Sequence, residues 1–118
     1  LSLHDALPIS ICATVVSIPL PGYATLDAGT KSLTSDLSAT PGSYGLIQEH
    51  PDVALVKLNE EHGYLRYDSE KVSLAIGDRL HIIPNHCCVV ANLVDEIYAF
   101  RNGILSETIT IDARGKSY

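Results

Sequence analysis

The stretch EIYAFRNGILSETITI, residues 96–111, contains the clearest secondary-structure signal in the chain and decides its fold class. Two runs rich in β-branched and aromatic residues, 96–101 and 104–111, flank the pair Asn102-Gly103. Asn-Gly readily adopts the positive φ angles that a type I′ turn requires. The stretch therefore predicts a β-hairpin.

More short strands are predicted upstream of this hairpin, between turns rich in glycine and proline. They cover residues 9–18, 23–27, 52–58, 61–67 and 79–83, and the short apolar run 87–93 extends the pattern. Only a polar helical turn at 31–37 interrupts them, and residues 38–44 have the composition of a loop. Many short strands are typical of a sheet that curls on itself. We predict a mainly β, antiparallel, partly closed β-barrel-like domain with little helix.

Composition narrows the functional classes. The 118 residues suffice for one domain, and 46% of them are hydrophobic, enough for a core. A net charge of −6 argues against nucleic acid or an anionic membrane as partner, and no apolar run is long enough to span a bilayer. Three cysteines, two of them adjacent, do not form a disulfide framework. These features favour a reducing, cytoplasmic location.

The start of the chain predicts that it is a fragment. The sequence contains no methionine, not even at position 1, so we expect the missing part to lie upstream. The opening residues 1–9 resemble translated sequencing-adapter read-through and fit poorly with the strand-rich sequence after them. The native domain is therefore expected to cover residues 10–118.

His86 and Cys88, in the string IPNHCCVVANL, form a candidate metal pair. In an extended segment they would share one face, and Cys87 would point to the other face and serve packing. A neutral imidazole and a thiolate are zinc ligands, and two ligands leave positions for water or substrate. The alternative is a buried structural cysteine beside a histidine that bonds to the backbone.

Two polar clusters are weaker candidates. Glu60, Glu61 and His62 could supply an acid/base pair or a further metal ligand, or they form a polar turn; for His62 both interpretations stay open. The segment 26–36 places Lys31 beside Gly29, and an ordinary solvated turn is the favoured interpretation. Gly29 is expected to supply a backbone conformation that other residues resist.

Several motifs in order carry a family resemblance. The chain reads ATVVSIP, LDAGTKSLTSD, EEHGYL, IGDRLHIIPNHCCVVANL, EIYAFRNG and DARG. This order resembles the C-terminal domain of the D-serine dehydratase and D-threonine aldolase family, over about residues 11–116. The resemblance implies an alanine-racemase-like plan, with an N-terminal α/β barrel followed by this β domain, and pyridoxal phosphate as cofactor. The cofactor lysine belongs to that barrel, and no residue here matches it, so the chain alone is expected to be inactive.

The resemblance also implies a site and a reaction. His86 and Cys88 match the metal pair of the dehydratase type, whereas the aldolase type carries aspartate in place of Cys88. Thiolate favours zinc. His62, Lys31 and Asn92 become candidates for lining the active site. The implied function is a lyase that acts on D-3-hydroxy amino acids and converts D-serine to pyruvate and ammonia.

Two alternatives remain open beside this function. The first is D-threonine aldolase activity on the same scaffold. The second is a free-standing, non-catalytic β-barrel module with an incidental His/Cys pair. For either enzymatic function the expected partners are the protein's own N-terminal barrel, a second copy in a homodimer and a D-amino acid substrate.

Overall fold

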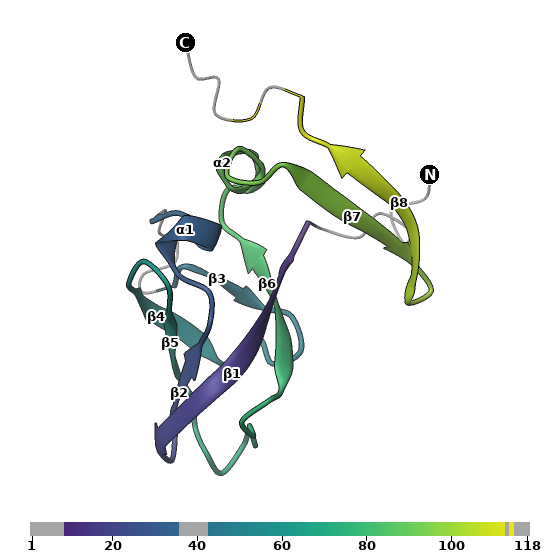
Figure 1. The fold of residues 1–118 in the computed structure, drawn as a ribbon. Coiled ribbons are helices and arrows are strands. Elements are labelled where there is room, and N and C mark those ends of the chain that lie inside the picture. The colour runs from purple at the N-terminus through teal and green to yellow at the C-terminus, as the bar shows by residue number, and fades with distance from the viewer. Residues whose placement is uncertain (1–8, 36–42, 113, 115–118) are drawn as a thin grey trace. The chain divides into compact units, whose positions relative to one another are not determined.

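Strands dominate the computed structural model, which describes residues 9–35, 43–112 and 114 (Figure 1). The chain divides into two compact units, residues 1–85 and 86–118. No helix among the described residues is long and apolar enough to cross a membrane.

The first unit is a closed antiparallel barrel. Its strand order is β1-β2-β5-β4-β3-β6, and β6 pairs back with β1 to close the sheet. The strands are β1 Ile11–Leu20, β2 Tyr23–Leu26, β3 Gly45–Ile47, β4 Ala54–Leu58, β5 Gly63–Arg66 and β6 Arg79–Pro84. The predicted mainly β, barrel-like fold is confirmed.

Two details of the barrel differ from the sequence-based expectation. The three-residue strand β3 was not predicted, because GLI is too short to show alternation and comes after a loop-like segment. Strand β1 continues past its predicted end to Leu20, through Pro19. The pairing of β1 with β2 is irregular between Ser17 and Leu20. A proline, which cannot donate to the ladder, is tolerated at such an irregularity.

The barrel core follows from strand alternation. Along β6, Leu80 and Ile82 are buried while Arg79 and His81 are exposed. Cross-strand register then brings buried residues together, as where Leu65 pairs with both Ala24 and Leu55. The buried cluster comprises Ala13, Val15, Ala24, Leu26, Ala28, Leu33, Ile47, Val53, Leu55, Leu65, Leu80 and Ile82.

The second unit contains a short helix, α2 Cys87–Ala91, and a hairpin of β7 Glu96–Arg101 and β8 Ile104–Thr110. Asn102 and Gly103 have φ angles of 53° and 77°, so the predicted Asn-Gly turn is confirmed. All of β8 is exposed, and so are the large apolar side chains of Tyr98 and Phe100 on β7. A two-stranded hairpin is only marginally stable in water.

The expectation of an extended segment at residues 87–93 is wrong. Cys87–Ala91 is helical, and the backbone N–H groups of Val90 and Asn92 donate to the carbonyls of His86 and Cys88. The β-branched pair Val89-Val90 suggested a strand. Such propensities are weak over five residues, and tertiary context overrides them.

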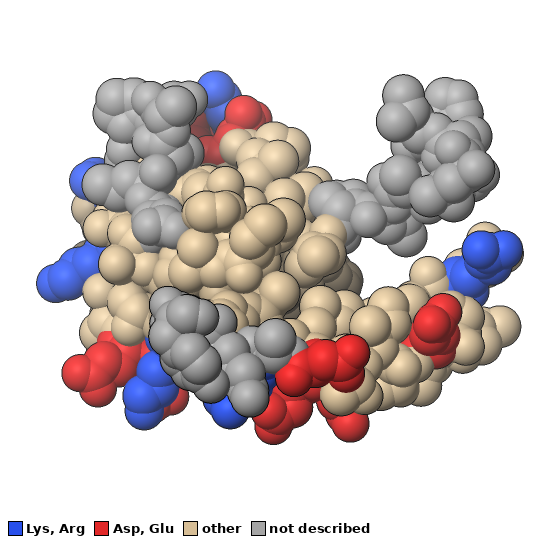
Figure 2. Space-filling model, turned by 90° about the horizontal axis from the view of Figure 1, so that it is seen from above, with Lys and Arg blue, Asp and Glu red and all other residues tan. Residues whose placement is uncertain are grey.

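Charged side chains are spread over the surface of the described residues. On the face shown in Figure 2, Lys and Arg lie singly, and several have Asp or Glu beside them. This face therefore presents no continuous basic surface of the kind that a polyanion requires.

Candidate functional site

His86 and Cys88 lie at the start of helix α2. His86 is the N-cap, with an extended backbone at φ −142° and ψ 93°, and Cys88 is the second helical residue. Strand alternation therefore does not place their side chains on one face, as the sequence had suggested. The exposed side chain of Cys87 also contradicts its expected packing role.

The donor types of this pair still fit a metal such as zinc. The structure leaves His86 and Cys88 both exposed, and Cys88 is a free thiol, so a cation can reach them. Within the described ranges, no three His, Cys, Asp or Glu side chains form a group that could hold a metal ion. The pair thus offers one nitrogen and one sulfur ligand, and any further ligand must come from elsewhere.

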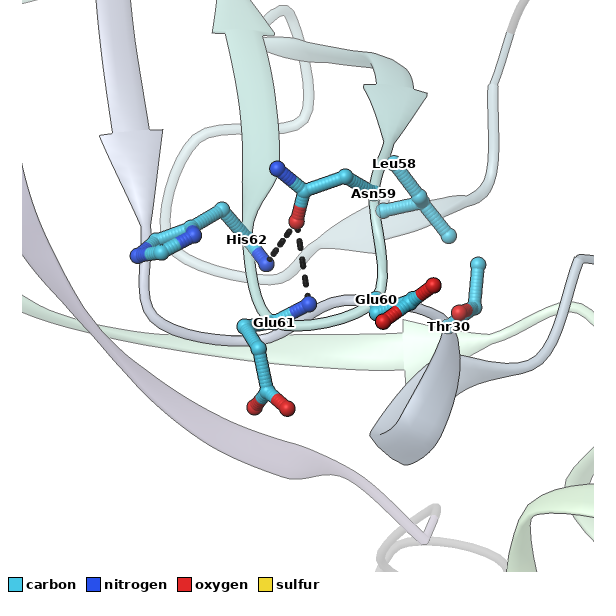
Figure 3. Close-up of a pocket in the computed structure, with 6 residues that line it drawn as sticks. All are labelled: Thr30, Leu58, Asn59, Glu60, Glu61 and His62. Atoms are coloured by element: carbon cyan, nitrogen blue, oxygen red, sulfur yellow. Dashed lines mark hydrogen bonds between the residues drawn. The ribbon is translucent and has the colours of Figure 1, made fainter.

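The turn between β4 and β5, residues 59–62, is held by its first residue. The side-chain Oδ1 of Asn59 accepts the backbone N–H groups of Glu61 and His62 at 2.9 and 2.6 Å (Figure 3). Its Nδ2 donates to the hydroxyl of Tyr64 at 2.9 Å. An asparagine that bonds to the backbone two residues on is a common turn device. Asn59 therefore fixes the backbone that carries His62.

The sequence predicted a possible turn at Asn59-Glu60, but it did not show that the side chain of Asn59 organises this turn. The available signal was an asparagine directly after the alternating run 52–58. The prediction instead centred on the charged residues that come next. Turn-forming asparagines act through short side-chain bonds to the backbone, and charge patterns do not reveal those bonds.

Helix α1, Thr30–Leu33, packs against this turn through its backbone. The N–H groups of Thr30 and Lys31 donate to the carbonyls of Asn59 and Glu60 at 2.8 and 3.2 Å. Gly29 makes this approach possible, since an added Cβ would lie 2.6 Å from the carbonyl oxygen of Glu60. Its φ of −128° is ordinary extended backbone. The predicted special conformation is therefore wrong, and close packing explains the glycine.

An open hollow of about 510 Å³ lies at this junction, lined by Thr30, Leu58, Asn59, Glu60, Glu61 and His62. In Figure 3 the imidazole of His62 extends away from the carboxylate of Glu60, which lies beside Thr30. The two therefore do not form the acid/base pair that the sequence allowed.

Lys31 forms an ion pair with Glu61, one of the residues that line this hollow. Its Nζ lies 2.5 Å from Oε1 of Glu61. The hydrogen bond from Lys31, reinforced by its charge, holds the pKa of Glu61 below its usual value. The same bond and charge raise the pKa of Lys31. Lys31 is therefore protonated and paired with Glu61.

Two of the three lining candidates lie in the barrel unit. Lys31 is on α1 and bonds to Glu60 and Glu61, and His62 follows these two residues in the turn 59–62. Asn92 belongs to the other unit, as the C-cap of α2, where its N–H donates to carbonyls of the helix.

A pH titration tests the Lys31–Glu61 pair. A lowered pKa means that the ionised Glu61 favours the folded state above its usual value of 4.5, and that this contribution disappears as pH falls through the lowered pKa. In Lys31→Ala, NMR should show the pKa of the Glu61 carboxyl moving upward. In the control variant Lys71→Ala, the pKa of Glu61 should not change. An unchanged Glu61 pKa in Lys31→Ala would show that the pair does not exist in solution.

Comparison with known proteins shows the family to which the chain belongs. Residues 8–100 match the model of the "Putative serine dehydratase domain". The chain belongs to this family. An uncharacterised protein of Mycobacterium tuberculosis (strain H37Rv) is 34% identical over 93 residues, which cover 79% of this chain and 70% of that protein. The D-threonine aldolase of an Arthrobacter species is 33% identical over 91% of this chain, which spans only 27% of the aldolase.

Solved structures show the same fold. The D-threonine aldolase of Filomicrobium marinum superimposes with a TM-score of 0.77 at 25% identity, over 92% of this serine dehydratase-like chain and 29% of its own. The D-threo-3-hydroxyaspartate dehydratase of Delftia sp. HT23 gives 0.69 at 25% identity, over 86% of this chain and 31% of its own. The chain therefore corresponds to less than a third of either enzyme.

Proposed function

We propose that this chain is the metal-carrying β domain of a pyridoxal-phosphate- and zinc-dependent lyase that acts on D-3-hydroxy amino acids. The dehydration of D-serine to pyruvate and ammonia is the reaction we favour. The observation that carries the proposal is the accessible His86/Cys88 donor pair within a serine dehydratase-like domain. Three free thiols and no disulfide among the described residues suit a cytoplasmic enzyme.

The spacing of the pair supports a metal role. The D-threo-3-hydroxyaspartate dehydratase was solved with alanine in place of a histidine, and with alanine in place of a cysteine two positions later. The cysteine variant is described as the metal-free form. His86 and Cys88 are also two positions apart. We infer that they serve as the metal pair of this domain.

His86 and Cys88 would hold the cation, and a divalent cation bound there would supply Lewis-acid chemistry toward the β-hydroxyl of the substrate. His86 and Cys88 both lie at the start of helix α2. In the barrel unit, Asn59 fixes the turn that carries His62. His62 would then orient a water molecule or the substrate.

Pyridoxal phosphate is expected to bind mainly outside this domain. Lys31 on α1 forms an ion pair with Glu61, and we do not propose it as the cofactor lysine. The N-terminal barrel that the family resemblance implies would supply the cofactor lysine. The exposed apolar hairpin of β7 and β8 is a surface that such a partner domain or a second copy could cover.

A specific observation keeps aldolase activity as the second candidate. The D-threonine aldolase of the Arthrobacter species is 33% identical over nearly the whole chain. Against it stands Cys88, because thiolate is a softer ligand than carboxylate and selects zinc over the harder cations manganese and magnesium. Comparing D-serine and D-threonine turnover of the complete enzyme decides between the two.

The test of the proposal is the metal content of the complete parent protein. We expect His86→Ala and Cys88→Ala each to contain about one zinc per chain less than the wild type, with turnover of D-serine reduced by at least about 100-fold because a ligand is missing. The matched control is Cys87→Ala, which removes the adjacent exposed thiol and should keep both metal and activity. Equal metal content in all three variants would refute the assignment.

A further inference from the structure

A second pair of metal-binding side chains lies on the outer surface of the barrel. Cys12 on β1 and His81 on β6 are direct cross-strand partners, beside the inward pair Ala13 and Leu80. Alternation places Cys12 and His81 on the outward face, and both are exposed. Side chains opposed in this way have Cβ atoms about 4.5–5.5 Å apart.

Glu49 follows β3, which pairs with β6 on the side away from β1, and it fixes the imidazole of His81. One carboxylate oxygen lies 2.5 Å from Nδ1 of His81, and the other accepts the backbone N–H of His81 at 2.8 Å. Burial, the largest influence, raises the pKa of Glu49, but the bonds and charge of His81 together with a backbone bond outweigh it, so the pKa is lowered.

The consequence is a defined tautomer. A carboxylate can only accept, so the ring nitrogen Nδ1 carries the proton and donates to Glu49. When the ring is neutral, the other ring nitrogen, Nε2, keeps its lone pair. Zinc-binding histidines are oriented by carboxylates in the same manner.

We propose that Cys12 and His81 bind a zinc-class divalent cation through Sγ and Nε2, with Glu49 orienting the imidazole. Nitrogen and sulfur are the donors that zinc prefers, and two protein ligands leave the remaining positions to water. Arg79, which pairs with Thr14 on the same face, weakens the site by its charge. The carboxylate of Asp27, which accepts the N–H of Thr14 at 2.8 Å, offsets part of that charge.

Binding would link the two strands that close the barrel. β1 is the first strand of the unit and β6 the last, and their pairing seals the sheet. A ligand that binds only the folded state stabilises it by mass action. Zinc should therefore raise the melting temperature even when the His86/Cys88 pair is absent.

The test uses the full chain carrying His86→Ala, Cys87→Ser and Cys88→Ala, titrated with Co²⁺ and then with Zn²⁺. We expect a thiolate-to-cobalt charge-transfer band in the near ultraviolet at one Co²⁺ per chain, and its loss on addition of Zn²⁺. Adding Cys12→Ser or His81→Ala should abolish the band. Glu49→Gln should weaken binding about tenfold, as is usual for a carboxylate that orients a ligand.

The matched control is Arg79→Ala, which alters the next outward residue of β6 and should keep the band with equal or tighter binding. Circular dichroism checks that each variant is folded. If Cys12→Ser does not fold, alkylation by iodoacetamide replaces it, since Zn²⁺ should protect Cys12 in the triple variant. No band, a band that survives His81→Ala, or no protection would each overturn the proposal.

Discussion

Leu65→Ala is expected to lower the free energy of unfolding by about 2–5 kcal/mol, the usual cost of such a cavity. Leu65 is 1% exposed and lies on strand β5, between Ala24 of β2 and Leu55 of β4. Alanine in its place would leave a void that neighbours on three strands cannot close. Small domains have only about 5–15 kcal/mol of stability, so the variant should be close to unfolding at 37 °C.

The measurement is urea unfolding of the chain, with the midpoint as readout. The matched control is Leu46→Ala on β3, because that leucine is 46% exposed and points outward. Its cost should stay below about 1 kcal/mol, as for a surface strand position. Equal costs at both positions would mean that the barrel does not enclose Leu65.

Gly29→Ala is expected to displace the turn that carries His62 and to cost about 1–3 kcal/mol, as overpacking does. The new Cβ would lie 2.6 Å from the backbone carbonyl carbon and oxygen of Glu60. The turn cannot yield freely, because both N–H bonds to Asn59 hold it. The backbone conformation of Gly29 is acceptable for alanine, so the clash alone produces the effect.

NMR of the His62 imidazole separates this effect from a general loss of stability. Gly29→Ala should shift the His62 resonances at temperatures where the protein remains folded. Ser32→Ala, on the same short helix, should leave them unchanged and alter stability by no more than about 0.5 kcal/mol. In the complete enzyme, Gly29→Ala and His62→Ala should both reduce turnover. Unshifted resonances in Gly29→Ala would show that α1 does not press on the turn.

Most of the barrel was predictable because its strands alternate clearly. The strands at 79–83 and 52–58 carry their buried residues two apart, and Asn102-Gly103 encodes its own turn. The three-residue strand β3 and the helical state of residues 87–91 were not predictable in this way. Their local patterns are too short to outweigh the contacts made after folding.

The candidate site residues also fall into two groups: those that the sequence indicated and those whose role only the tertiary structure showed. The sequence by itself indicated His86, Cys88, His62 and Lys31, because these residue types have distinct chemistry. Only the tertiary structure showed that Lys31 forms an ion pair with Glu61, thirty positions away, and that Gly29 allows the backbones of α1 and the 59–62 turn to approach each other.

The sequence alone therefore determined the fold class and the family of this protein, since strand alternation, turn chemistry and motif order are local properties of the chain. Tertiary structure alone decided the closure of the barrel by β1 and β6, the helix after His86, and the bond between His81 and Glu49. Each of these depends on the register between distant strands or on contacts made only after folding. Such long-range geometry is not contained in any single segment of the sequence.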